Sequence, residues 1–217
     1  ERLKLIADKD SFIEFDADMI GKNPIDFPGY EKKQGNLRTA TGLKDAVITG
    51  EIKIRRIRAV VAIMDTSYMM ASMGSVVGEK VSRIMEKAVS LKIPMLAVTS
   101  SGGARMQESA LSLMQMAKTA CAAGKLDEAG ILYINLLTEP TFGGITASFG
   151  TLGDVIIAEQ GARIGFAGRR VIEQTIHQSL PSDFQTAEYL LKYGQVDIVE
   201  KRKNLRKTLS KILEMHS

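Results

Sequence analysis

The chain has 217 residues, of which 45% are hydrophobic and 25% charged, which is typical of a globular protein and excludes a disordered one. Its net charge of +4 is compatible with binding nucleic acid or acidic small molecules. No apolar run approaches the roughly 20 residues that span a bilayer, and the N-terminal residues lack a signal-peptide core, so we expect a cytoplasmic protein. The single cysteine, Cys121, permits neither an internal disulfide nor a four-cysteine zinc site, and we expect it to be buried.

The N-terminal part changes from helix and loop to strands. Residues 1–40 indicate helix and loop, because Asn23-Pro24 and Pro28-Gly29 interrupt any longer element. Three strand-like runs follow, at residues 46–49, 52–57 and 59–64. The third run is continuously apolar, which is typical of a strand covered on both faces.

Helices and strands alternate over the rest of the chain. The pattern predicts helices over residues 74–92 and from Gly102-Gly103 to about Cys121, then a short helix opening at Gly143-Gly144. Strands are predicted at residues 95–99, 131–137, 155–158 and 163–166, and two or three helices end the chain. The last helix would bury four apolar residues and expose its basic ones; the apolar residues are Leu205, Leu209, Ile212 and Leu213. This alternation predicts an α/β fold with right-handed crossovers, and without a clean linker we expect a single domain over residues 1–217.

Two strand-to-helix turns carry paired glycines, Gly102-Gly103 and Gly143-Gly144. Glycine allows a ligand to approach the backbone closely, and the first N–H groups of a helix have no partner within the helix. Two such groups can form an oxyanion hole for an enolate or a tetrahedral oxyanion. A tight turn without a ligand and a phosphate site are the other interpretations. The sequence lacks the Gly-Lys-Ser/Thr ending and the GxGxxG spacing of the common nucleotide-binding motifs.

Side chains suited to acid–base chemistry are sparse. His216 lies next to the C-terminus, and His177 and Glu108 are expected on helices, where solvated or paired side chains are the usual outcome. Backbone donors without an acid–base pair fit a reaction in which the enzyme stabilises an enolate while another group removes the proton.

Several segments in one order resemble the β subunit of the bacterial-type, multi-subunit acetyl-CoA carboxylase carboxyltransferase. The similarity covers nearly the whole chain, which is far more specific than any single motif. The segments that carry it are residues 41–47, 72–80, 101–108, 113–119, 140–144, 165–175 and 181–188.

The resemblance implies a crotonase-type ββα spiral and transfer of a carboxyl group from carboxybiotin to acetyl-CoA. The product would be malonyl-CoA, in the first committed step of fatty acid synthesis. It implies biotin on a separate carrier protein, an α subunit in an α2β2 heterotetramer, and a biotin carboxylase in the larger complex. Because the chain has a single cysteine, we expect no metal in it. It places the catalytic amides at Gly102 and Gly103. The implied substrate-binding residues are Ala104, Gly143, Gly144, Gly165 and Phe166.

The sequence departs from the family pattern in two places. The family carries an N-terminal four-cysteine zinc ribbon, which a chain with one cysteine cannot form. The family also has glycines just before Ser72-Met73-Gly74, where this chain has Tyr68-Met69-Met70-Ala71.

Three other functions remain open on the sequence. A self-contained enoyl-CoA hydratase would need paired carboxylates, and Glu108 has no clear partner. A malonate decarboxylase subunit is harder to exclude from the residues alone. A nucleic-acid-binding module could use Arg55, Arg56, Arg58 and the basic run at residues 201–207, although we expect no nucleic acid partner.

Overall fold

The computed structural model describes residues 1–216, and within them the strands form one eight-stranded sheet. The strands are β1 (Ile13–Phe15), β2 (Val47–Ile54), β3 (Ile57–Met64), β4 (Met95–Ser101), β5 (Tyr133–Phe142), β6 (Val155–Glu159), β7 (Ile164–Gly165) and β8 (Ile198–Glu200). The spatial order is β1-β2-β3-β4-β5-β6-β8, and β7 pairs with the end of β5. The first two pairings are antiparallel and all later ones are parallel.

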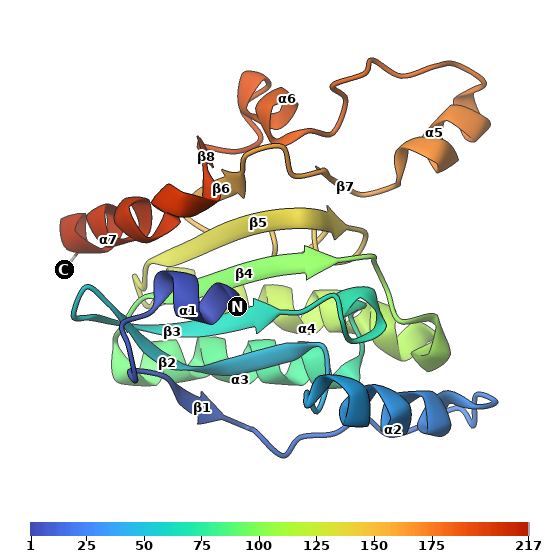
Figure 1. Cartoon of the computed structure of the whole chain (residues 1–217), viewed down its shortest axis with the longest axis horizontal. Coiled ribbons are helices and arrows are strands. Elements are labelled where there is room, and N and C mark those ends of the chain that lie inside the picture. Colours follow the sequence, from blue (N-terminus) through green and yellow to red (C-terminus); the bar gives the residue numbers. More distant parts are fainter. Residues whose placement is uncertain (217) are drawn as a thin grey trace.

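Helices cover both faces of this sheet (Figure 1). They are α1 (Arg2–Ile6), α2 (Tyr30–Thr41), α3 (Ser75–Leu91), α4 (Ala110–Glu128), α5 (Arg169–Ile176), α6 (Ala187–Lys192) and α7 (Leu205–Met215). Short 3-10 turns lie at Met69–Ala71, Met106–Glu108 and Arg202–Asn204. Of the helices in residues 1–216, none is both long and apolar enough to cross a bilayer.

The sequence of β3 shows why two layers of helices are needed. Val60 and Ala62 face the cluster formed with α3 and α4, whereas Val61 and Ile63 face the cluster formed with α1 and α7. Successive side chains of a strand point to opposite faces, so a continuous apolar run requires cover on both. The predicted two-sided burial of this strand is therefore confirmed.

The predicted helix over residues 74–92 is confirmed as α3, and its apolar stripe is buried as the periodicity requires. The C-terminal prediction is also confirmed. Leu205, Leu209, Ile212 and Leu213 of α7 are all buried, while the neighbouring basic residues Lys207 and Lys211 are exposed.

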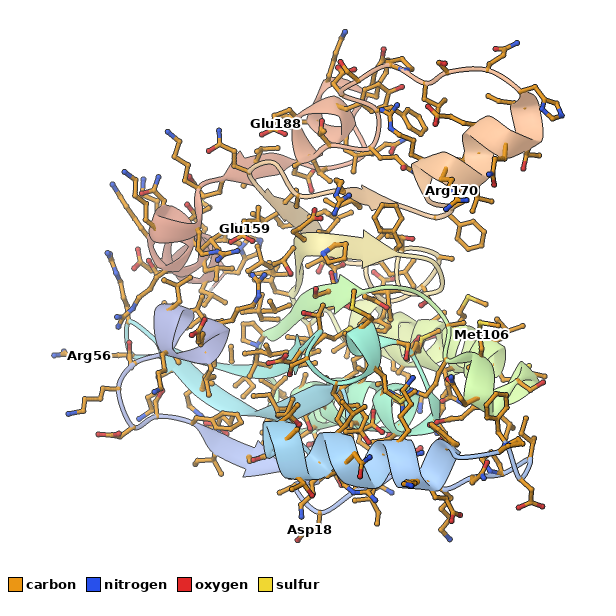
Figure 2. The ribbon with its side chains drawn as sticks, turned by 45° about the vertical axis from the view of Figure 1, so that its right-hand side comes forward. Asp18, Arg56, Met106, Glu159, Arg170 and Glu188 are labelled. Atoms are coloured by element: carbon orange, nitrogen blue, oxygen red, sulfur yellow. The ribbon has the colours of Figure 1, made fainter. Side chains whose placement is uncertain are left out.

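The two strands predicted at residues 46–49 and 52–57 form the single strand β2, which turns directly into β3. The turn residues Arg55 and Arg56 have left-handed φ values of 47° and 71°, an unusual conformation for non-glycine residues in a sequence without a turn signal. The Asp8 carboxylate stabilises it by accepting both backbone N–H groups, at 2.9 and 2.7 Å. Arg56 points away from the hairpin tip (Figure 2).

The helix predicted to open at Gly102-Gly103 begins later, at Ala110, and runs past Cys121 to Glu128. After Gly103 the chain stays extended, because Ala104 forms a parallel bridge with Met73. The 3-10 turn at Met106–Glu108 then redirects the chain. Cys121 is exposed on α4, contrary to the prediction of burial.

The segment just before Ser72 is left-handed at three consecutive positions. Met69, Met70 and Ala71 have φ values of 47°, 53° and 50°. A Cβ makes this conformation costly, by roughly 1–2 kcal/mol per residue. The non-glycine residues that stand here instead of the expected glycines therefore carry backbone strain.

Candidate active site

The two paired-glycine turns lie at the carboxyl ends of neighbouring parallel strands. Gly102-Gly103 follows β4 and Gly143-Gly144 follows β5. The turns are in direct contact, because a Cβ added to Gly143 would lie 2.7 Å from the Cα of Gly103. Gly103 and Gly143 also have φ values of 124° and 66°. Both positions therefore require glycine, one for its conformation alone and one for conformation and space.

The amides of Gly102 and Gly103 already have acceptors inside the protein. The Gly102 N–H donates to the Met70 carbonyl at 2.8 Å, and the Gly103 N–H donates to the Ser101 hydroxyl at 3.0 Å. Neither residue lies at a helix N-terminus, since α4 starts at Ala110. In this structure each of these N–H groups therefore has its single hydrogen engaged, and the expected oxyanion hole at this pair stays a prediction that these contacts do not support.

Two other amides beside the contact between the turns have no acceptor among residues 1–216. One belongs to Ala104, whose neighbours Gly103 and Arg105 make the bridge bonds to Met73. The other belongs to Gly144, the second residue of the turn that begins β5's connection to β6. A Cβ added to Gly143 would lie 3.8 Å from the Ala104 nitrogen, so the segments that contain Ala104 and Gly144 meet at this point.

The second turn is helical in character but forms no regular helix. The Ala147 N–H bonds to the Gly143 carbonyl at 3.1 Å, as in one turn of α-helix, and the chain then turns away. The first N–H groups of such a turn have no partner within it. Gly144 is therefore in the position where an outward-pointing donor is expected.

Gly165 and Phe166 lie against the second turn through their backbones. Both carbonyls accept the Gly143 N–H, at 3.3 and 3.0 Å. The Phe166 side chain is 67% exposed. It borders a cavity of about 310 Å³, whose other lining residues include Leu137, Thr146, Ile164 and Leu190.

Hydroxyl groups hold the end of β5 against β4. The Thr99 carbonyl accepts hydrogen bonds from the hydroxyls of Thr138 and Thr141, at 2.6 and 3.1 Å. The Ser100 hydroxyl donates to the carbonyls of Glu139 and Pro140, which are joined by a cis peptide bond. These contacts fix the strand from which Gly143 and Gly144 project.

Glu108 is buried behind the first turn, together with Arg105, Asp45 and Tyr30, and all four are at most 1% exposed. Glu108, expected on a helix as a solvated or paired charge, is paired, but it lies in the 3-10 turn and is buried. Its carboxylate accepts the Tyr30 hydroxyl at 2.7 Å and the Ser75 N–H at 2.6 Å. The Arg105 guanidinium forms a two-bond pair with Asp45 at 2.7 and 2.9 Å.

Titratable side chains near the turns are engaged in structural contacts. Burial alone would lower the pKa of Arg105, but the Asp45 carboxylate more than offsets this, so the pKa is raised and the guanidinium stays charged. Neither histidine lies in the turns, since His177 ends α5 and His216 follows α7. Residues 1–216 contain no group of three or more His, Cys, Asp and Glu placed to hold a metal ion. The structure therefore offers backbone donors at this point, as the sequence indicates.

The chain is similar in sequence to carboxyl transferases. Residues 1–189 match the model of the carboxyl transferase domain family. The whole chain is 58% identical over 216 residues to the acetyl-coenzyme A carboxylase carboxyl transferase subunit beta of Clostridium kluyveri, and covers 74% of that protein. Its counterpart in Clostridium botulinum is 55% identical, with 75% of its length covered.

Solved structures with the same fold are also carboxyl-handling proteins. A transcarboxylase 12S structure with hydrolysed methylmalonyl-coenzyme A bound superposes with a TM-score of 0.86 at 29% identity, over 98% of this chain and 40% of that one. A malonate decarboxylase heterodimer from Pseudomonas has a TM-score of 0.74 at 20% identity, over 99% of this chain and 84% of that one, and shows the fold alone. The expected α/β, crotonase-type architecture is confirmed.

Proposed function

The chain belongs to the carboxyl transferase domain family, and from this premise we propose that it is the β-type half of an acetyl-CoA carboxylase carboxyltransferase. It moves a carboxyl group onto acetyl-CoA to give malonyl-CoA. The observation that carries this proposal is the 58% identity across the entire chain, joined to a site of backbone donors. The malonate decarboxylase alternative has only 20% identity and no comparable support.

The oxyanion hole of this site consists of the Ala104 and Gly144 amides. Both N–H groups lack an acceptor in residues 1–216, and their segments meet at the contact between Gly143 and Gly103. The thioester oxygen of acetyl-CoA gains negative charge when its α-carbon loses a proton. Two fixed donors stabilise that charge at little reorganisation cost, and losing one donor typically lowers the rate by about 10²–10³-fold.

The donor set fits a reaction that uses carboxybiotin from a separate carrier protein. When bound, carboxybiotin supplies both the carboxyl group and the base for the α-proton. Among the described residues, the titratable side chains beside these amides are engaged in structural contacts, so a base that arrives with the carboxyl donor suits this site. Gly103 and Gly143 contribute by allowing the left-handed conformations of the two turns, and Gly143 also by letting the turns pack against each other. Gly165 and Phe166 contribute by fixing the Gly143 end of the second turn.

The partners that we propose are an α-type subunit in an α2β2 assembly, the biotin carrier protein and a biotin carboxylase. Exposed apolar side chains on α4, on α5 and on the segments that follow β4 and β7 support a protein partner for this chain. Met106, Met114, Phe166 and Val171 are between 58% and 81% exposed. Met106 lies at the surface beside the start of α4 (Figure 2). Exposed apolar groups gathered around a site are typical of an interaction surface.

The test measures malonyl-CoA formation from acetyl-CoA and carboxybiotin, with and without the α-type partner, for the parent chain and for Ala104→Pro. Proline removes the Ala104 N–H, so we expect the rate to fall by about 10²–10³-fold. Ala104→Gly is the matched control, because it keeps the N–H and should retain far more activity than the proline variant. Circular dichroism establishes that each variant is folded.

Each outcome has a distinct meaning. Product that requires the partner supports the half-site proposal, and product from this chain alone would show a self-contained enzyme instead. Full activity in folded Ala104→Pro would contradict the amide assignment while leaving the reaction intact.

A further inference from the structure

Arg105 immediately follows Ala104, and both its backbone and its side chain make contacts that hold this part of the chain. Its backbone N–H donates to the Met73 carbonyl at 2.9 Å, which closes the bridge that keeps Ala104 extended. Its side chain turns into the interior and is completely buried. The residue next to a proposed oxyanion donor is thus anchored at both its backbone and its guanidinium.

The guanidinium uses all three of its nitrogens. Nη1 and Nη2 bind the two carboxylate oxygens of Asp45, Nη2 also donates to the Ser72 carbonyl at 2.9 Å, and Nε donates to the Ser72 hydroxyl at 3.3 Å. Nη1 further approaches Tyr30 and Glu108, at 3.4 and 3.5 Å. A planar fork with this many partners permits a single orientation.

The network joins parts of the chain that are distant in sequence. Tyr30 comes from α2, Asp45 from the segment before β2, and Ser72 from the segment that pairs with Ala104. Glu108 in turn accepts the first N–H of α3, at Ser75. A Cβ on Gly74 would lie 2.6 Å from Glu108 Oε1 and 3.0 Å from Arg105 Cδ, so the network has no spare room.

We propose that Arg105 is a positioning residue for carboxyl transfer, which sets the place of the Ala104 amide through its buried contacts with Asp45 and Ser72. This inference rests on the proposed function. A buried ion pair contributes little net stability compared with apolar residues of similar size, but it imposes one geometry. Arg105 therefore matters for the placement of the donor, and a displacement of about 1 Å can lower a rate by about 10²-fold.

The net charge of the buried group suggests variants that distinguish a positioning role of Arg105 from a purely structural one. The group of Arg105, Asp45 and Glu108 carries one positive and two negative charges. Arg105→Met leaves two buried carboxylates without their cation, and should lower the melting temperature markedly. The double variant Arg105→Met with Asp45→Asn restores the original net charge, so much of the stability should return. The guanidinium fork is absent from both.

The experiment measures kcat, KM for acetyl-CoA and melting temperature for these variants in the assembled carboxyltransferase with its α-type partner. We expect kcat to fall by about 10²-fold in the single and in the double variant, with KM changing far less. Leu209→Ala is the matched control: it removes a fully buried side chain from α7, on the opposite face of the sheet. It should lower the melting temperature and leave kcat unchanged.

A kcat that returns together with stability in the double variant would overturn the proposal, because Arg105 would then have a purely structural role. If Arg105→Met does not fold, Arg105→Lys decides the question. Lysine keeps the charge but loses the fork, so we expect a reduced kcat, and an unreduced kcat overturns the proposal. If the parent complex forms no malonyl-CoA, the proposed function fails and this inference fails with it. An active parent with unaffected variants refutes the positioning role alone.

Discussion

Ala104 and Gly144 show how the hydrogen-bond partners of single residues decide which amides can act. By sequence, the amides of Gly102, Gly103, Ala104 and Gly144 could serve equally well. Met70 and Ser101 take up the N–H groups of Gly102 and Gly103, and leave those of Ala104 and Gly144. The residue types of Met70 and Ser101 do not indicate that these two residues accept the N–H groups of the glycine turn.

Lys80 is a buried cation on α3, only 2% exposed, whose nearest carboxylate, on Glu14, lies 4.0 Å away. Burial lowers the pKa of Lys80 below 10.5, and attraction to Glu14, Asp16 and Asp45 offsets only part of this effect. The folded chain therefore releases this proton at a lower pH than the unfolded chain does. Stability should rise with pH through the alkaline range between the folded pKa and 10.5.

We expect Lys80→Met to raise the free energy of unfolding at neutral pH by about 1 kcal/mol or more, because methionine has no charge to desolvate. The variant should also lose the contribution that rises with alkaline pH. Urea denaturation at several pH values measures both effects. Lys211→Met, at an exposed position on α7, is the control and should change little. A destabilised Lys80→Met would show that the neighbouring carboxylates need this cation.

Met70 carries backbone strain with little packing in return, since its φ is 53° and its side chain is 56% exposed. Met70→Gly should relieve the strain, for a net stabilisation of up to about 1 kcal/mol after the greater entropy of the unfolded glycine chain is counted. Met114→Gly is the matched control: it is 61% exposed but lies within α4, where glycine costs about 1 kcal/mol. Thermal or urea unfolding compares the two. Equal destabilisation of both would contradict the strain argument.

Among the elements, the 3-10 turn at Met106–Glu108 separates the first glycine turn from α4. As a result the Glu108 side chain points into the protein interior. The inward carboxylate accepts the first N–H of α3, so it caps a helix remote in sequence. A helix that started at Gly102 would move Glu108 and break its hydrogen bonds with the Ser75 N–H and the Tyr30 hydroxyl. The element boundary therefore follows from the buried network and not from the local helix propensity.

α5 differs from the other long elements because none of its residues is buried. It projects from the body of the protein on the side where β4 and β5 end (Figure 1). Its partners are local, since Arg169 bonds to Glu173 and to the Leu180 carbonyl. An amphipathic helix without tertiary burial is expected to open readily.

We expect the amides of α5 to exchange with deuterium about 10²-fold or more faster than those of α3 in the isolated chain, and to slow when the α-type partner is added. Hydrogen exchange followed by mass spectrometry measures both. α3 is the internal control, because its apolar stripe is buried between the sheet and α4. Slow exchange of α5 without a partner would show that it is stable by itself. Fast exchange that persists in the complex would show that the partner leaves it uncovered.

At the scale of the whole molecule, the described residues form two large apolar clusters on the two faces of the sheet, a smaller third cluster beside α6, and a set of ion pairs. One large cluster lies between the sheet and α3 with α4, and the other between the sheet and α1 with α7. Asp8 joins the β2–β3 hairpin to α7, because it accepts the hairpin amides and pairs with Arg206. The backbone N–H of Arg56 is the largest cause of the lowered pKa of Asp8.

The basic surface is partly neutralised by these pairs. Arg58 forms a two-bond pair with Glu51, and Arg202 pairs with Glu159. Glu159 lies beneath the C-terminal segment (Figure 2). Arg58 and Arg202 are two of the arginines that the nucleic-acid interpretation would use, and in this structure both are paired with acidic side chains.

The sequence by itself determined the architecture. Periodicity directly reflects which faces of an element are buried. The continuous apolar runs predict the buried strands β3 and β4, and the apolar stripe predicts the helix α3 that covers the sheet. It also determined the family, because residues matched in order along the chain. The glycine turns were identifiable because two of these positions demand glycine for conformation or space.

Only the tertiary structure decided which amides are free, where α4 begins and why Glu108 is buried. Each depends on a contact between segments far apart in sequence, such as Met70 with Gly102, Met73 with Ala104 and Tyr30 with Glu108. Periodicity reports burial along one element and carries no information on hydrogen bonds between elements. For that reason the sequence indicated the two glycine turns, whereas the contacts of the fold show which of their amides have acceptors.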